Sequence, residues 1–371
     1  MIDGRTLIFD WATGKSGFEE DGFCASRSCV RALESRRIQY FLIPSYSCNL
    51  NCSYCFQRKS ALSRKKSGRR VLDFFFEEVD REVERSEGVS PSISLFGGEP
   101  LVLSNKEYVV RFMEEVEKRN LSFRIYTNGL GLGDYLEDLL VFKKNLEHVH
   151  VTFDGGINVH DCRRGKGVYD KVLRNIQQAS PALNFVLRIN VDNENVRGIE
   201  TLLEDVSGVS NVAAYFAPVR EDLCAKGLTN GRVLGNRFLF EVLKYSKKYD
   251  VGLKGFLGVE EGKAAALGEK VVAKHCFCVK KRVFDPFGFV YPCICTAGYP
   301  DFACRKEFNF EKVTSDWWAD FNSFKKEPCN LCQWFFACGG GCNLEWKTGK
   351  VTRCANELEQ NLIAAYKFYS S

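Results

Sequence analysis

The sequence predicts an α/β protein in which a partial (β/α)6 TIM-like barrel is followed by a small, cysteine-rich α+β domain. Two observations carry this prediction. Between residues 39 and 217, short β-rich runs alternate with amphipathic stretches, and repeated strand–helix order predicts a parallel sheet with right-handed crossovers. After about residue 252 the alternation stops and cysteines become frequent. We therefore expect a cap or accessory segment at 1–38, the barrel at 39–250 and the cysteine-rich domain, with a C-terminal helix, at 251–371.

The individual elements follow from the hydrophobic period and from runs of β-branched and aromatic residues. Strands are expected at 40–44, 92–96, 123–126, 149–153, 185–191 and 211–218. Helices are expected at 71–85, 106–119, 134–144, 169–178, 199–206, 232–248 and 355–369. A hairpin is expected at 283–292, because Asp285-Pro286-Phe287-Gly288 places proline second and glycine fourth in a turn. Barrels of this kind carry their chemistry on the loops that follow the strands, so motifs on these loops are expected to lie together.

Composition limits the class of protein. Of 371 residues, 45% are hydrophobic and 27% are charged, which excludes disorder as the main state. Seventeen residues are cysteine and only 4 are histidine. An odd number of cysteines in so long a chain argues against a disulfide scaffold and favours reduced thiols that bind iron–sulfur clusters or zinc.

The charge and the apolar pattern narrow the expected partners and compartment. Lys and Arg number 52 against 47 Asp and Glu, a net charge of +5, which is too small to indicate nucleic-acid binding. The first residues lack the pattern of a signal peptide, and no uninterrupted apolar run reaches about 18 residues. We expect a cytoplasmic protein with no nucleic-acid or membrane partner.

Three cysteines follow the first predicted strand. Cys48, Cys52 and Cys55 lie in the segment CNLNCSYC. Three thiolates at this spacing can bind three irons of a four-iron cubane, and a four-iron cluster normally takes four cysteines. The incomplete set therefore predicts an exogenous ligand on the fourth iron. The alternative is a zinc knuckle with a distant fourth ligand.

Here the sequence resembles the radical S-adenosylmethionine (SAM) enzymes over roughly residues 40–220. Their cysteine loop is Cys-x3-Cys-x-aromatic-Cys, and Tyr54 supplies the aromatic residue. The segment containing Gly97, Gly98 and Glu99 is similar to the family's GGEP loop, which holds the methionyl ammonium of SAM. By itself, this segment would be read as an ordinary turn.

Two more segments resemble cofactor-binding positions of that family. Thr127 and Asn128 are similar to its TNG segment beside SAM. Arg188 and Asn190 resemble positions near the ribose and the carboxylate, and the planar fork of an arginine suits a carboxylate. The alternative for Arg188 is a salt bridge inside the barrel.

A further block resembles a region common in peptide-modifying members of the family. It contains Asp154-Gly155, His160, Asp161 and Arg163, followed by a Gly-x-Gly segment. The resemblance implies that Asp161 and Arg163 brace the loop. A direct catalytic role for His160 is the alternative, and no catalytic residue is assigned.

The C-terminal cysteines match the seven-cysteine signature of the SPASM extension of radical SAM enzymes. In members with two auxiliary clusters the ligands interleave. The resemblance implies that the first cluster uses Cys278, Cys293 and Cys342, and that the second uses Cys329, Cys332, Cys338 and Cys354. Cys276 is the nearest fourth ligand of the first cluster; Cys295, Cys304 or an open iron are alternatives. The rival interpretation is a structural zinc ribbon. Cys162 and Cys224 match no motif and are expected to be buried thiols.

The resemblance implies a peptide maturase with SAM and [4Fe-4S] clusters as cofactors. Such an enzyme generates a 5′-deoxyadenosyl radical and installs a thioether or carbon cross-link in a ribosomally made precursor peptide. Its partners would be that peptide or a protein substrate and a reductant such as flavodoxin or ferredoxin. The main rival is an anaerobic sulfatase-maturating enzyme that forms formylglycine, but Ile294 stands where that group carries Asp after the Tyr-Pro-Cys segment. Non-catalytic rivals are an iron–sulfur electron carrier and a zinc-stabilised binding protein.

Overall fold

The structure is a computed structural model of the chain. It describes residues 7–10, 15–18, 38–52, 54–55, 57, 66–86, 90–219, 236–253, 259–267, 281–306 and 355–370. The chain forms two compact units. The barrel unit comprises Arg37–Gly231 and Cys278–Trp317, and the second unit comprises Met1–Arg36, Arg232–Phe277 and Trp318–Ser371. In the described ranges, no helix has the length and apolarity that crossing a membrane requires.

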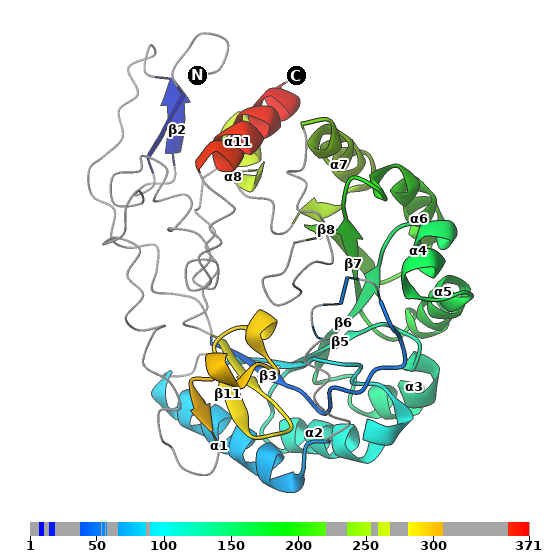
Figure 1. Ribbon diagram of the computed structural model, residues 1–371, viewed down its shortest axis with the longest axis vertical. Helices are drawn as coiled ribbons and strands as arrows, with labels where there is room; N and C mark the ends of the chain where they lie inside the picture. The colour runs from blue at the N-terminus through cyan, green and yellow to red at the C-terminus, as the bar shows by residue number, and fades with distance from the viewer. Residues whose placement is uncertain are drawn as a thin grey trace. The chain divides into compact units, whose positions relative to one another are not determined.

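Within the described part of the barrel unit, six parallel strands follow one another in chain order (Figure 1). They are β3 (Gln39–Leu42), β4 (Ser92–Leu95), β5 (Phe123–Thr127), β6 (Leu146–Phe153), β7 (Phe185–Val191) and β8 (Val212–Pro218). Each strand pairs in parallel with the next, as Tyr40 with Ile93 and Thr152 with Arg188. This order confirms the predicted parallel sheet of a partial barrel.

Helices connect these strands and lie on the outer side of the sheet (Figure 1). They are α1 (Arg69–Arg85), α2 (Lys106–Lys118), α3 (Leu132–Val141), α4 (Ile157–Arg164), α5 (Val168–Ala179) and α6 (Ile199–Val206), with short 3-10 turns η2 (Leu103–Asn105) and η3 (Val196–Gly198). In α1 the apolar residues recur with the helical period, so Leu72, Phe75 and Val79 are buried on one side. Helix α4 was not predicted, because only His160 and Arg164 of it are buried and neither gives an apolar stripe.

The barrel unit also contains short elements from the C-terminal half. They are β10 (Lys281–Phe284), β11 (Phe289–Tyr291), β12 (Arg305–Lys306), η5 (Ile294–Thr296) and η6 (Pro300–Phe302). Strands β10 and β11 form the predicted hairpin, and Gly288 closes its turn with a φ of +79°. The sequence did not predict that β10 pairs in parallel with β3 and extends the barrel sheet. Phe284 packs beneath α1, 5.1 Å from the ring of Phe75, and burying such a side chain stabilises the fold by about 1.5–3 kcal/mol.

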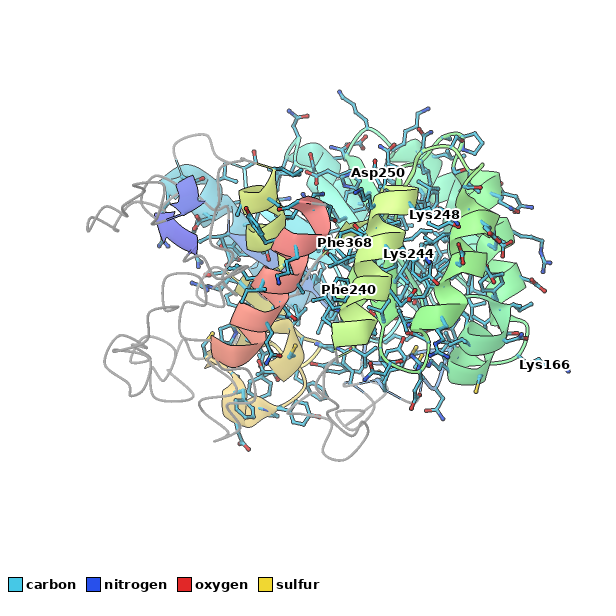
Figure 2. The ribbon with its side chains drawn as sticks, turned by 90° about the horizontal axis from the view of Figure 1, so that it is seen from above. Lys166, Phe240, Lys244, Lys248, Asp250 and Phe368 are labelled. Atoms are coloured by element: carbon cyan, nitrogen blue, oxygen red, sulfur yellow. The ribbon has the colours of Figure 1, made fainter. Side chains whose placement is uncertain are left out.

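The described part of the second unit consists of a hairpin and helices. Its elements are β1 (Leu7–Asp10), β2 (Lys15–Phe18), β9 (Gly252–Leu253), α7 (Asn236–Tyr249), α8 (Val259–Ala266) and α11 (Ala355–Ser370). Gly262 of α8 lies so close to α11 that a Cβ there would be 2.3 Å from the carbonyl oxygen of Leu362. The rings of Phe240 on α7 and Phe368 on α11 are 6.5 Å apart (Figure 2). Helices α7 and α11 confirm the predicted helices at 232–248 and 355–369.

Candidate functional site

The loop after β3 carries the three cysteines predicted to hold a cluster. Cys48 is exposed, Cys52 and Cys55 are partly exposed, and all three are free thiols. The N–H of Cys55 donates to the carbonyl of Cys52 at 3.2 Å, and the N–H of Leu50 donates to Cys48 Sγ at 3.4 Å. Backbone donors to sulfur tune the cysteine ligands of iron–sulfur clusters. Although Cys48 as a residue is exposed, the protein around its sulfur desolvates the thiol and raises its pKa to about 11.

Among the described residues, no three His, Cys, Asp or Glu side chains are grouped so that they could hold a single metal ion.

The loop after β4 touches the cysteine loop through its glycines. Gly97 and Gly98 have φ values of +87° and +51°, and a Cβ on Gly98 would lie 2.4 Å from the carbonyl oxygen of Ser47. The N–H of Glu99 donates to that same oxygen at 2.8 Å, and the N–H of Gly98 donates to Gln57 Oε1 at 2.8 Å. Only glycine permits this backbone conformation and approach without strain, so the segment has a more specific role than an ordinary exposed turn.

Glu99 joins this loop to the one after β5. The residue is 1% exposed. Its Oε1 accepts from Leu101 N–H at 2.9 Å and from the Thr127 hydroxyl at 2.6 Å, and its Oε2 accepts from Asn128 N–H at 2.6 Å. Burial raises the pKa of Glu99 despite these hydrogen bonds. Because a carboxylate offers about four acceptor positions, Glu99 can accept one more donor, such as an ammonium group.

The side chain of Asn128 completes the junction of the three loops. Its Nδ2 donates to Asn49 Oδ1 at 2.7 Å and lies 3.9 Å from Cys48 Sγ. Its Oδ1 accepts from Leu130 N–H at 3.0 Å. The structure thus brings together the predicted residues after β3, β4 and β5.

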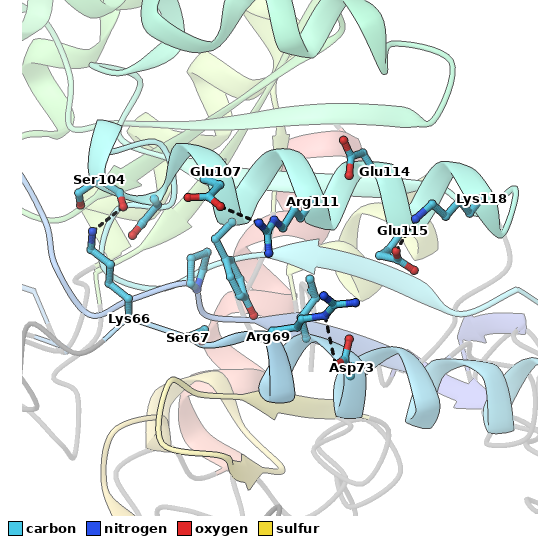
Figure 3. A pocket seen from close by; sticks show the side chains of 14 residues that line it. Lys66, Ser67, Arg69, Asp73, Ser104, Glu107, Arg111, Glu114, Glu115 and Lys118 are labelled. Atoms are coloured by element: carbon cyan, nitrogen blue, oxygen red, sulfur yellow. Dashed lines mark hydrogen bonds and ion pairs between the residues drawn. The ribbon is translucent and has the colours of Figure 1, made fainter.

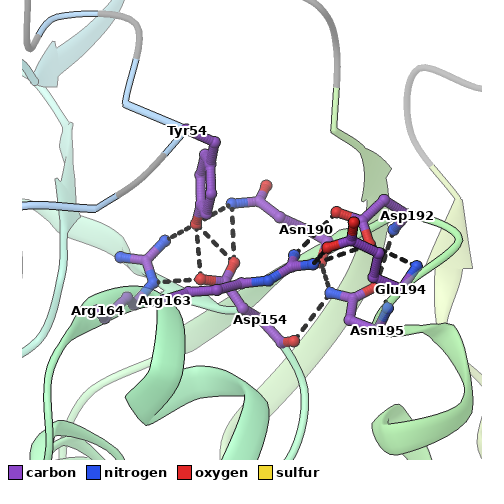
Figure 4. A network of polar contacts seen from close by, with 8 residues as sticks. All are labelled: Tyr54, Asp154, Arg163, Arg164, Asn190, Asp192, Glu194 and Asn195. Atoms are coloured by element: carbon purple, nitrogen blue, oxygen red, sulfur yellow. Dashed lines mark hydrogen bonds and ion pairs between the residues drawn. The ribbon is translucent and has the colours of Figure 1, made fainter. Parts of the chain in front are cut away.

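Tyr54 of the cysteine loop is bound to β6 and α4 by a buried polar network (Figure 4). Its hydroxyl donates to Asp154, 2.6 Å from Oδ1. Arg164 Nε donates to Asp154 Oδ2 at 2.7 Å, and Arg164 Nη2 donates to the Tyr54 oxygen. Asp154 is 0% and Arg164 is 8% exposed. Burial alone would raise the pKa of Asp154, but Arg164 and Tyr54 hold it below its usual value.

Arg164 is the residue of this network that the sequence analysis missed. The neighbouring Arg163, expected to brace the loop, pairs with Asp192 at 2.9 Å and Glu194 at 3.3 Å, just after β7 (Figure 4). The detectable signal was the four-residue spacing of His160 and Arg164, which places both on one face of α4. Both are buried there.

The other residues of this block have structural contacts. Asp161 accepts from the N–H groups of Gly167 at 2.5 Å and Tyr169 at 2.9 Å, and so holds the start of α5. The His160 ring lies 5.0 Å from the Phe153 ring, and neither of its nitrogens has a hydrogen-bond partner in the described ranges. Burial and the nearby Arg164 charge lower the pKa of His160 to about 4, so it is neutral at pH 7.

Cys162 corrects an expectation, because it is exposed rather than buried. Helix α4 turns His160 and Arg164 inward, which leaves Cys162 on the solvent side. Cys224 lies outside the described residues.

Arg188 and Asn190 lie on β7 beside this network. Arg188 Nε donates to Asn190 Oδ1 at 3.2 Å, and Asn190 Nδ2 donates to the Tyr54 hydroxyl oxygen at 3.1 Å. Asn195 Nδ2 supports the strand end by donating to the carbonyls of Asp154 at 2.8 Å and Asn190 at 2.7 Å. None of the carboxylates in the described part of the chain forms an ion pair with Arg188.

Of the predicted auxiliary-cluster cysteines, Cys293 is described. It is buried and lies directly before η5, while Cys295 and Cys304 are partly exposed. The Cys304 thiol donates to the Val290 carbonyl at 3.2 Å. The remaining predicted ligands, Cys276, Cys278, Cys329, Cys332, Cys338, Cys342 and Cys354, lie outside the described residues.

A pocket of about 460 Å³ lies between the first turn of α1 and one side of α2, along which its lining extends to Lys118 (Figure 3). Two of its cations contact neighbours: Lys66 donates to the Ser104 carbonyl at 2.7 Å, and Arg111 pairs with Glu107 at 2.7 Å. No cysteine and no predicted cofactor contact lines it. This pocket is therefore separate from the candidate site.

Comparisons with known proteins agree with this geometry. Residues 42–206 match the family model of the radical SAM superfamily, so the chain contains a radical SAM domain. The cysteine-type anaerobic sulfatase-maturating enzyme of Clostridium novyi is 24% identical over 80% of this chain and 85% of its own. The mycofactocin maturase MftC of Mycolicibacterium smegmatis is 24% identical over 80% of this chain and 76% of its own.

Solved structures share the fold. Native anSMEcpe with bound AdoMet and the Cp18Cys peptide superposes with a TM-score of 0.64 at 22% identity, covering 89% of this chain and 96% of that one. SuiB of Streptococcus suis, bound to the precursor peptide SuiA, gives a TM-score of 0.62 at 16% identity, covering 84% and 73%.

Proposed function

From the radical SAM domain at residues 42–206, we propose that the chain is a peptide maturase. In this proposal it removes a hydrogen atom from one residue of a ribosomally made precursor peptide and installs a thioether or carbon cross-link. The support is that relatives and structural neighbours include a mycofactocin maturase and a protein bound to its precursor peptide. The main structural observation behind this proposal is that the cysteine loop after β3 meets the loop after β4, which contains Glu99, and the loop after β5, which contains Asn128.

The cysteine loop would hold the cluster, and the surrounding loops would hold SAM. Cys48, Cys52 and Cys55 suit three irons of a cubane, which leaves one iron for SAM. When bound, the cluster and SAM together would supply the 5′-deoxyadenosyl radical that takes the hydrogen atom. Gly98 lets the backbone approach closely, and Glu99 has an acceptor position for the methionyl ammonium.

The barrel wall would orient the rest of the cofactor. Arg188 has a planar donor fork and no carboxylate ion pair within the described ranges, so it suits the methionyl carboxylate. Asn190 reaches Tyr54 and suits the ribose side. Loops that exclude water there would protect a reactive radical from side reactions.

The C-terminal cysteines would bind two auxiliary clusters. Cross-linking a peptide removes a pair of hydrogen atoms: one goes to the 5′-deoxyadenosyl radical, and the other leaves as a proton and an electron. Clusters held by these cysteines would accept that electron, and a flavodoxin or ferredoxin would supply the electron that starts the reaction.

Sulfatase maturation is the second candidate, because curated relatives of this chain include cysteine-type sulfatase-maturating enzymes. Against it, Ile294 replaces the Asp that follows the Tyr-Pro-Cys segment in that group. In that group the Asp serves as the catalytic base. In our proposal an enzyme that lacks it forms a cross-link rather than formylglycine.

Anaerobic reconstitution and mass spectrometry separate the candidates. We expect about twelve irons per chain if all three clusters are cubanes. Short peptides encoded beside the gene should lose a pair of hydrogen atoms, whereas a sulfatase-derived cysteine peptide should stay unchanged. Formylglycine in the cysteine peptide would establish sulfatase maturation instead, and zinc without iron would exclude both enzymes.

A further inference from the structure

A buried carboxylate lies between two of the cysteine loops. Asp285, in the turn of the β10–β11 hairpin, is 0% exposed. Its Oδ2 accepts hydrogen bonds from the hydroxyls of Tyr46 and Tyr291, each at 3.1 Å. Its Oδ1 accepts from the N–H groups of Phe287 at 2.9 Å and Phe289 at 3.0 Å. All of its acceptor positions are thus used within the protein.

The two tyrosines occupy equivalent positions in the sequence. Tyr46 is two residues before Cys48, and Tyr291 is two residues before Cys293. Both tyrosines are buried, at 7% and 0% exposure. Each hydroxyl donates to the same carboxylate oxygen, so the two tyrosines are joined through one atom.

The surrounding contacts make this link rigid. The N–H of Ile43 donates to the carbonyl of Phe284 at 2.9 Å, where β3 meets β10. The ring of Tyr46 stacks on Phe287 with centroids 6.5 Å apart and an interplanar angle of 28°. A displacement of either tyrosine therefore also shifts the shared carboxylate and, through it, the other tyrosine.

We propose that Asp285 is a positioning residue that couples the Cys48–Cys52–Cys55 loop to the Cys293 loop through Tyr46 and Tyr291. The inference rests on the proposed function, since it assumes that both loops hold iron–sulfur clusters. Hydrogen bonding and burial set the potentials of such clusters. A carboxylate shared in a low-dielectric interior transmits a change at one loop to the other, and such coupling is reciprocal.

The test is a redox titration of the reconstituted full chain, followed by electron paramagnetic resonance of each cluster. Tyr46→Phe and Tyr291→Phe each delete one hydroxyl. Tyr135→Phe is the matched control, because Tyr135 is equally buried and its hydroxyl donates to the Val102 carbonyl, at 2.9 Å. Iron content and circular dichroism verify that each variant is folded and loaded.

If the loops are coupled, each substitution changes the reduction potential of the remote cluster as well as that of the adjacent one. Loss of one hydrogen bond to the shared carboxylate should change the one-electron reduction equilibrium of the remote cluster by about two- to tenfold, where tenfold corresponds to 59 mV. The double variant Tyr46→Phe/Tyr291→Phe should change it by less than the sum of the single effects. A purely structural role would give adjacent effects alone, with the remote cluster matching the Tyr135→Phe control, and that result would overturn the inference.

The outcome separates this inference from the proposed function. Remote shifts in a chain that binds both clusters but does not cleave SAM would support the coupling and refute the enzyme. Intact SAM cleavage without remote shifts would refute the coupling alone. Asp285→Asn serves as a second variant, since it removes the carboxylate charge while both tyrosines remain.

Discussion

Arg164→Met removes the cation that balances the fully buried Asp154. The Asp154 carboxylate would keep the Tyr54 hydroxyl as a donor but lose the 2.7 Å contact to Arg164 Nε. Removing one partner of a buried ion pair costs about 3–5 kcal/mol, because the other charge stays buried without compensation. We therefore expect the free energy of unfolding to fall by that amount, measured by anaerobic urea titration with far-ultraviolet circular dichroism.

Arg163→Met is the matched control for this substitution. Arg163 is the next residue on α4, but its partners Asp192 and Glu194 have side-chain exposures of 22% and 81%. The Arg163 side chain is itself 11% exposed. Because water and salt screen a partly exposed pair more than a fully buried one, the control should lose less stability than Arg164→Met. Equal losses for the two variants would refute the reasoning.

The pH dependence gives an independent check of the same pair. In the wild type the folded-state pKa of Asp154 lies below its unfolded value near 3.8, so its contribution is complete above that pH and is lost as pH falls through the folded pKa. Without Arg164, burial raises the pKa of Asp154 above the unfolded value. The difference in free energy of unfolding between the wild type and Arg164→Met should therefore shrink as pH falls from 8 toward 5. A difference that stays constant over this range would contradict this account.

Two other substitutions test the neighbouring structure. Gly98→Ala places a Cβ 2.4 Å from the Ser47 carbonyl oxygen, so this variant should not bind SAM in equilibrium dialysis. The control variant Gly68→Ala, whose Cβ meets no atom within 4 Å, should bind SAM normally. SAM binding by both variants would contradict the proposed contact. His160→Phe removes a buried ring whose pKa is about 4. The wild type should lose stability between pH 7 and 5, because the unfolded histidine takes up a proton that the folded one does not. The variant should lose less over that range, and an unchanged slope in urea titrations would show that His160 is not responsible.

The barrel was predictable because its signals are local. The predicted strand at 40–44 is a continuous apolar run, and α1 buries residues at the helical period. The position of each motif after a strand then predicted that Cys48, Glu99 and Asn128 would meet, and the structure brings them together.

The long-range contacts could not be predicted in this way. The hairpin turn at Asp285 was visible in the sequence, but its pairing with β3 depends on Phe284 packing under α1. Likewise, local sequence does not distinguish Arg163 from Arg164. The rotation of α4 about its axis determines which of the two arginines is buried. The sequence did not reveal this rotation, because α4 has no apolar stripe. The auxiliary-cluster ligands, Cys293 included, stay predictions.

Anaerobic SAM cleavage tests the central claim most directly. With dithionite as reductant, the reconstituted wild type should form 5′-deoxyadenosine, measured by chromatography. Cys52→Ala should form none while retaining the absorbance of auxiliary clusters, and Cys162→Ala, which removes an exposed cysteine outside the cysteine loop, should match the wild type. Cleavage by Cys52→Ala, or no cleavage by the wild type with iron bound, would contradict a radical SAM site at Cys48, Cys52 and Cys55.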